Sequence, residues 1–85
     1  MTRHAVISPA QADVLRQLLG EGGTNRQIAR RLNLTEDTVK SHMRALLAAA
    51  KTADRTALAV AVLTGSVTPV VKGRSTWHTT ERKSA

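Results

Sequence analysis

Three hydrogen-bonding side chains with helical spacing stand out in the middle of the chain: Lys40, Ser41 and Arg44. Residues three and four apart lie on one face of a helix, so these side chains would point the same way. Lysine and arginine donate to O6 and N7 of guanine, and serine bonds in either direction. Such a stripe near the N-terminal half of a helix suits the major groove of DNA. An ordinary solvated helix face would have the same composition.

The helix that would carry this stripe has an apolar opposite side. Its apolar positions recur at helical spacing: Val39, Met43, Leu46, Leu47 and Ala50. Thr35 is expected to cap this helix, and Glu36 and Asp37 complement the positive end of its dipole. We expect His42 to be a buried, hydrogen-bonding residue beside the apolar side. The sequence therefore predicts a helix over about residues 36–50 with one buried and one exposed side.

A second helix is predicted just before it, across a connection of three residues. Thr24 and Gln27 form a capping box that begins this helix, which ends at Asn33. Ala29 is small enough for two helices to approach closely, and asparagine tolerates the positive φ that a tight turn requires. Val39 would be the buried residue of the following helix. This spacing indicates a helix-turn-helix, although many helical hairpins share it.

Two further helices flank this pair. Ser8 and Gln11 form another capping box, which begins a first helix that ends at the glycines of residues 20–23. Asp54 would cap a fourth helix over residues 55–64, and Gly65 would terminate it.

The segment after residue 65 differs in composition from the rest. Residues 66–85 are rich in Ser, Thr and basic side chains, which predicts a flexible basic tail with a short strand near Val70 and Val71. Its basic residues could follow a phosphate backbone, or could simply keep the chain soluble. These residues are Lys72, Arg74, Arg82 and Lys83.

Composition narrows the class of protein. The 85 residues include no cysteine, which excludes disulfides, thiolate chemistry and zinc fingers, and the length indicates one domain without a receiver or ligand-sensing domain. The longest apolar stretch, residues 57–63, is far shorter than the ~20 residues of a membrane-spanning helix. The formal net charge is +7, and residues 24–55 hold seven basic side chains against three acidic ones. We therefore expect a cytoplasmic protein with a polyanionic partner.

No catalytic, cofactor or metal site is expected. His4, His42 and His78 are scattered without metal-ligand spacing, and the serines have no base and acid near them in the sequence. No glycine-rich phosphate loop follows a predicted strand. The sequence thus gives no support to an enzyme.

The two central helices resemble a known family. Residues 24–32 read Thr-Asn-Arg-Gln-Ile-Ala-Arg-Arg-Leu, and residues 34–42 read Leu-Thr-Glu-Asp-Thr-Val-Lys-Ser-His. Both are similar to the LuxR-type helix-turn-helix domain, whose pattern runs T/S-N-x-x-I-A-x-x-L and then L/I-S/T-x-x-T-V-K-x-H. Residues 54–59 resemble the opening of its fourth helix, so the resemblance spans roughly residues 7–64. The N-terminal half also resembles sigma factor region 4, more weakly.

The resemblance implies an all-α, four-helix helix-turn-helix domain over residues 1–65, followed by the basic tail at 66–85. Its recognition helix would span about residues 36–50, and a dimerisation helix about residues 55–64. The implied DNA-binding residues are Thr24, Asn25, Arg26, Thr35, Thr38, Lys40, Ser41 and Arg44, of which the last three would read bases. The implied dimer interface consists of Leu58, Ala61 and Val62.

We therefore expect a sequence-specific transcription regulator from a bacterium or its phage. It would bind double-stranded DNA as a homodimer, at the nucleoid, with no cofactor and no membrane association. The alternative is a small adaptor that binds RNA polymerase or a larger regulator through its fourth helix and tail.

Overall fold

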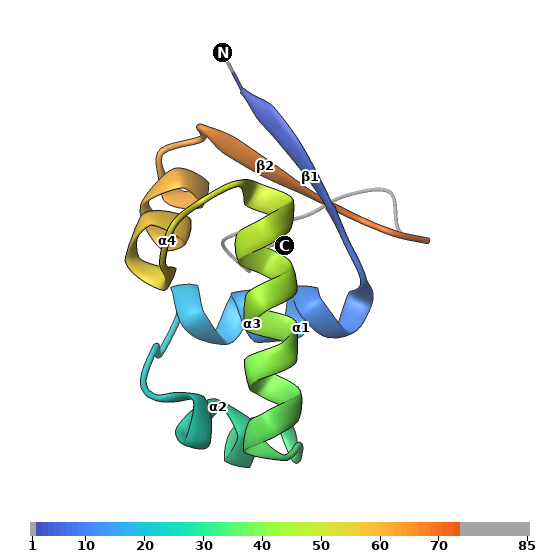
Figure 1. Cartoon of the computed structure of the whole chain (residues 1–85), viewed down its shortest axis with the longest axis vertical. Coiled ribbons are helices and arrows are strands. Elements are labelled where there is room, and N and C mark those ends of the chain that lie inside the picture. Colours follow the sequence, from blue (N-terminus) through green and yellow to red (C-terminus); the bar gives the residue numbers. More distant parts are fainter. Residues whose placement is uncertain (1, 74–85) are drawn as a thin grey trace, which may run out of the picture.

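Four helices and two short strands make up the described part of the chain, which is residues 2–73 of this computed structural model (Figure 1). In chain order they are β1 (Arg3–Ile7), α1 (Pro9–Leu19), α2 (Asn25–Leu32), α3 (Glu36–Ala50), α4 (Arg55–Leu63) and β2 (Val67–Val71). The four helices lie where the sequence predicts them. α3 is central, because α1, α2, α4 and β1 all pack against it.

Side chains of the preceding residue cap each helix at its N-terminus. At α1 the backbone amide of Gln11 donates to Ser8 Oγ at 3.1 Å, while the backbone amide of Ser8 donates to the side-chain Oε1 of Gln11 at 2.9 Å. Thr24 and Gln27 form the same reciprocal pair at α2, at 3.2 and 2.9 Å, so both predicted capping boxes are confirmed. Asp54 caps α4 through its carboxylate. These bonds satisfy amides that a helix leaves unpaired, which fixes where the helices begin.

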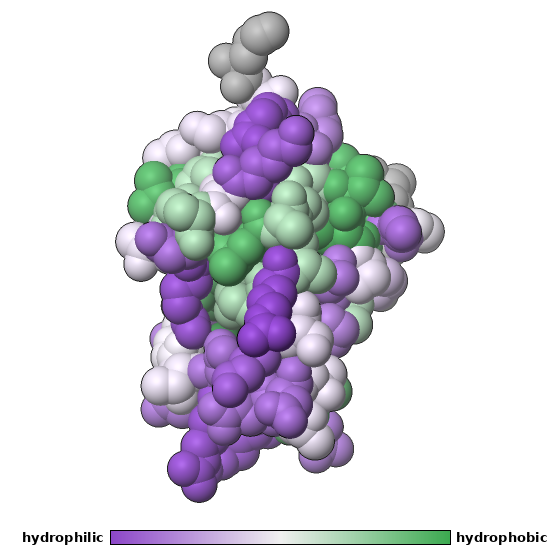
Figure 2. Space-filling model, viewed as in Figure 1, coloured by the Kyte–Doolittle hydropathy of each residue, from purple (hydrophilic) through white to green (hydrophobic). Residues whose placement is uncertain are grey.

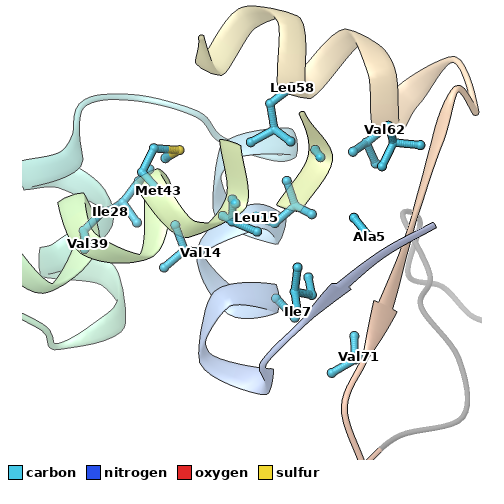
Figure 3. Packing of buried hydrophobic residues seen from close by; sticks show 14 of the residues in the cluster. Ala5, Ile7, Val14, Leu15, Ile28, Val39, Met43, Leu58, Val62 and Val71 are labelled. Carbon is cyan, nitrogen blue, oxygen red and sulfur yellow. The ribbon is translucent and has the colours of Figure 1, made fainter. Parts of the chain in front are cut away.

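One apolar core joins the helices to the strands (Figure 3). Leu15 of α1 and Leu58 of α4 point into it, together with Ile7 of β1. Val39, predicted to be the buried residue of α3, is fully enclosed. Burial of a side chain of this kind contributes about 1.5–3 kcal/mol, so this core supplies the main stabilising term.

The two strands correct the prediction of an all-α fold. β1 and β2 pair in parallel, with Arg3 opposite Val67 and Ile7 opposite Val71. The pairing joins opposite ends of the described chain, because all four helices lie between the strands. Local sequence patterns carry no information about such a distant partner, which is why β1 was not predicted.

β2 also belongs to the folded body, although it lies within residues 66–85, which the sequence predicts to be a tail. The predicted strand near Val70 and Val71 is present and begins at Val67. Val67 and Val71 are each only 2% exposed, because one side of the strand packs onto the core. Arg74, Arg82 and Lys83 lie outside the described residues.

Helix length also bears on membranes. Within residues 2–73, no helix combines the length and the apolar character needed to cross a bilayer.

Neighbouring valines in β2 test whether this strand stabilises the fold. We expect Val71→Ala to lower the free energy of unfolding by about 1.5–3 kcal/mol, because it removes buried methyl groups and leaves a cavity. Val70→Ala is the matched control, since Val70 is 37% exposed and lies on the outer side of the same strand.

Urea denaturation of both variants measures the difference. The control should change the free energy of unfolding by less than about 1 kcal/mol. Equally small effects at the two positions would mean that β2 contributes nothing to stability in solution.

Candidate nucleic-acid interface

A tight turn sets the relation between α2 and α3. Asn33 has φ 58° and ψ 45°, which confirms the expectation that this position needs a left-handed backbone. The turn is closed by the Leu34 amide, which donates to the Ala29 carbonyl at 2.8 Å. Ala29 is buried where α2 meets α3, so a larger side chain there would force the helices apart. The two helices thus form the predicted helix-turn-helix.

α3 presents its polar stripe to solvent. Lys40, Ser41 and Arg44 are all exposed, while the opposite side of the helix is buried. Figure 2 shows the most hydrophilic surface over the lower half of the molecule, where Figure 1 places α2 and the N-terminal half of α3. Asp37 lies exposed on the same stripe, in the first turn of α3. The stripe therefore combines the donors of Lys40 and Arg44 with a serine that bonds in either direction and one carboxylate acceptor, and it is exposed to a partner.

His42 was predicted to be buried and hydrogen-bonded, which is wrong. It is half-buried, and its side chain makes no hydrogen bond to another residue within 2–73. It lies between the buried and exposed sides of α3. Among the described residues, no three His, Asp or Glu side chains are placed to hold a metal ion.

Two threonine hydroxyls meet at the start of α3. Thr35 Oγ1 accepts from the Thr38 amide at 3.1 Å, and the two hydroxyl oxygens lie 2.8 Å apart. A single hydrogen bond between them uses one of their two protons. The other proton stays available to an acceptor outside the protein, beside the positive end of the α3 dipole.

The start of α2 is only partly free for a ligand. Arg26 is exposed, and its side chain makes no hydrogen bond or ion pair with the rest of residues 2–73. Thr24 is exposed, but its hydroxyl oxygen already accepts from the Gln27 amide. Asn25 is half-buried, and its Oδ1 accepts from Arg55 Nη1 at 3.1 Å. Of the Asn25 side chain, only the amide nitrogen could donate to a ligand.

Some arginines form hydrogen bonds inside the protein and others are exposed to solvent, a difference that their charge does not reveal. Arg31 and Arg55 donate hydrogen bonds to backbone carbonyls of the loop before α2, so they bind within the protein. Arg30, in contrast, is exposed on α2 one helical turn after Arg26, and the sequence analysis did not select it. The spacing of four residues between two arginines was the signal that could have identified it.

The predicted dimer interface on α4 needs correction. Leu58 and Val62 are 1% and 6% exposed, and they point into the core of their own chain (Figure 3). They are therefore not available to a second copy. Ala61 is half-buried and also packs against the core. The exposed apolar residues of α4 are Val60, at 53%, and Leu63, at 62%.

Comparison with known proteins agrees with this arrangement. The sequence profile of the family described as "Bacterial regulatory proteins, luxR family" matches residues 5–62. Relatives include the nitrate/nitrite response regulator protein NarL of Escherichia coli strain K12 and the protein of the same name from strain O6:H1 (CFT073), each 41% identical over 54 residues. The aligned segment is 64% of this chain and 24% of each relative, so the chain spans about a quarter of their length. No solved structure matches the chain significantly.

The matched residues take in the whole helix-turn-helix and nearly all of α4. Together with the exposed basic stripe on α3, they identify the chain as a member of the LuxR family of bacterial regulatory proteins, with its DNA-binding helix-turn-helix domain.

Proposed function

We propose that this chain is a sequence-specific transcription regulator that places α3 in the major groove of DNA. The observation that carries the proposal is the exposed stripe of Lys40, Ser41 and Arg44, held next to the helix-turn-helix turn. Lys40 and Arg44 would donate to guanine, and Ser41 would bond to any base edge within reach. Asp37 could accept from cytosine N4, which would add selectivity. Such a regulator would act on the nucleoid, in the cytoplasm.

Phosphate contacts would come from the beginnings of α2 and α3. The donors at the start of α3 would be the hydroxyl groups of Thr35 and Thr38, which keep one free proton between them. The donors at the start of α2 would be the Arg26 guanidinium, the Thr24 side chain and the side-chain amide nitrogen of Asn25. Both helix starts also carry backbone amides and a positive dipole end, which favour an anion. Contacts of this kind supply much of the affinity and make binding weaken steeply with salt.

Dimerisation would use the outward side of α4. Val60 and Leu63 are three residues apart, so they lie on one side of the helix and form an exposed apolar pair. Pairing of two α4 helices would bury these side chains and place two copies of α3 on one duplex.

The same apolar pair also favours a second candidate, an adaptor that binds RNA polymerase or a larger regulator through α4. A gel shift with genomic fragments separates the two functions. No selective retention of any fragment, together with co-purification of polymerase, would support the adaptor.

Two substitutions on α3 test base reading. Lys40→Ala and Arg44→Ala should each reduce the difference in binding free energy between the selected site and random duplex by about 1–3 kcal/mol, because each removes a base contact. Titration of both duplexes at fixed salt measures this difference.

Lys72→Ala and Arg3→Ala are the matched controls, since both cations are exposed beside the strands and away from α2. They should leave the discrimination unchanged. If Lys40→Ala and Arg44→Ala weaken both duplexes equally, these residues hold phosphates and do not read bases.

A second test concerns the dimer. The double substitution Val60→Ser and Leu63→Ser should reduce the complex on a two-half-site duplex from two protomers to one, because each side chain loses on the order of 1 kcal/mol or more of apolar burial. Sedimentation of the complex reports the stoichiometry.

Val6→Ser is the control, since Val6 is a comparably exposed apolar residue on β1. It should keep two protomers on the duplex. Wild-type protein that binds as one protomer even at saturation would remove the dimer from the proposal.

A further inference from the structure

Arg55 joins two helix starts that are far apart in sequence. It is the first residue of α4 and is half-buried. Its Nη1 donates to Asn25 Oδ1 at 3.1 Å, and its Nη2 donates to the Gly23 carbonyl. One guanidinium therefore ties the start of α4 to the start of α2.

The loop that it holds contains two glycines in left-handed conformations. Gly22 and Gly23 have φ of 67° and 96°, conformations that glycine adopts freely and that impose no further restraint on the chain. Arg31 of α2 holds the loop at the preceding residue, because its Nη1 donates to the Gly22 carbonyl at 3.0 Å and to Gln17 Oε1 at 2.9 Å. Two arginines thus bind successive carbonyls.

The hydrogen bonds of the Arg55 guanidinium are directed into the protein, whereas the neighbouring Arg26 is exposed. Each terminal nitrogen of its guanidinium donates to a protein acceptor, so the Arg55 guanidinium is held against the start of α2. Arg26 lies directly after Asn25 and is exposed without a protein partner within residues 2–73. The orientation of this free cation depends on where the first turn of α2 sits.

We infer that Arg55 is a positioning residue that holds the phosphate-binding start of α2 against α4. The inference rests on the proposed DNA-binding function. In consequence, the proposed dimerisation helix α4 and the first turn of α2, which carries the proposed phosphate donors, move as one rigid unit. The separation of two protomers on DNA would then set the position of both α2 helices directly.

Substitution of Arg55 by lysine is the discriminating test. Lysine keeps the charge, but its single ammonium cannot reproduce the planar fork that reaches two acceptors. We expect Arg55→Lys to weaken binding to a random duplex on the order of tenfold, within the range of typical coupling between sites. The slope of log K against log salt should become shallower by about one to two, because phosphate contacts of α2 are lost.

Arg3→Lys is the matched control, since Arg3 is exposed on β1 and lies away from α2 (Figure 1). It should bind DNA as wild type does. Unchanged affinity and slope in Arg55→Lys would overturn the inference, because they are the result expected of a direct phosphate contact that needs only charge. The inference would also be overturned if Arg55→Lys lowers the melting temperature but leaves DNA binding unchanged at temperatures well below melting. Arg55 would then only stabilise the fold.

The two proposals fail in different ways. If wild-type protein binds no duplex, the proposed function fails, whereas wild-type binding that Arg55→Lys retains sinks only the inference. Amide chemical shifts of residues 24–27 in the free protein show, without DNA, whether the lysine disturbs the start of α2. Should Arg55→Lys not fold, Arg55→Gln removes the fork and keeps one amide donor. Its backbone amide shifts at residues 24–27, measured without DNA, should differ from those of the wild type, and unchanged shifts would overturn the inference.

Discussion

Burial of the apolar side of α3 is the constraint on which the rest of the structure depends. Val39, Met43 and Leu46 are enclosed by α1, α2, α4 and β1, so α3 cannot rotate about its axis without exposing them to water. Each such side chain contributes about 1.5–3 kcal/mol when buried, which makes a rotated helix strongly unfavourable. The same constraint decides which side chains face outward. Lys40 and Arg44 are thus presented by a helix whose orientation is fixed before any partner arrives, which lowers the ordering cost of binding.

What could be predicted from the sequence was local. The capping boxes at Ser8 and Thr24, the left-handed turn at Asn33 and the two sides of α3 all follow from residue types a few positions apart. The parallel pairing of β1 with β2 could not be predicted, because it depends on two short segments at opposite ends of the described chain. β2 also lies beyond the residues that match the family profile.

The side chains of α4 show a second limit of sequence patterns. The helix is apolar nearly all round, so its periodicity does not distinguish the side that packs inward from the side that stays exposed. The residues assigned to the dimer, Leu58 and Val62, turned out to be core residues, while Val60 and Leu63 remain exposed. Net charge likewise does not distinguish cations that bind inside the protein from cations that are exposed to a partner. Arg55 adds to the basic balance of the chain as Arg26 does, yet its donors hold a loop and those of Arg26 are free.

Selection of bound sites from a pool of random duplexes tests the central claim, which is that α3 reads base sequence. The account predicts enrichment of one motif made of two related half-sites, with centres about 10 base pairs or a multiple of that spacing apart, since a pair of recognition helices must meet successive major grooves. Recovery of duplexes without any common motif, at an affinity that depends only on salt, would contradict it.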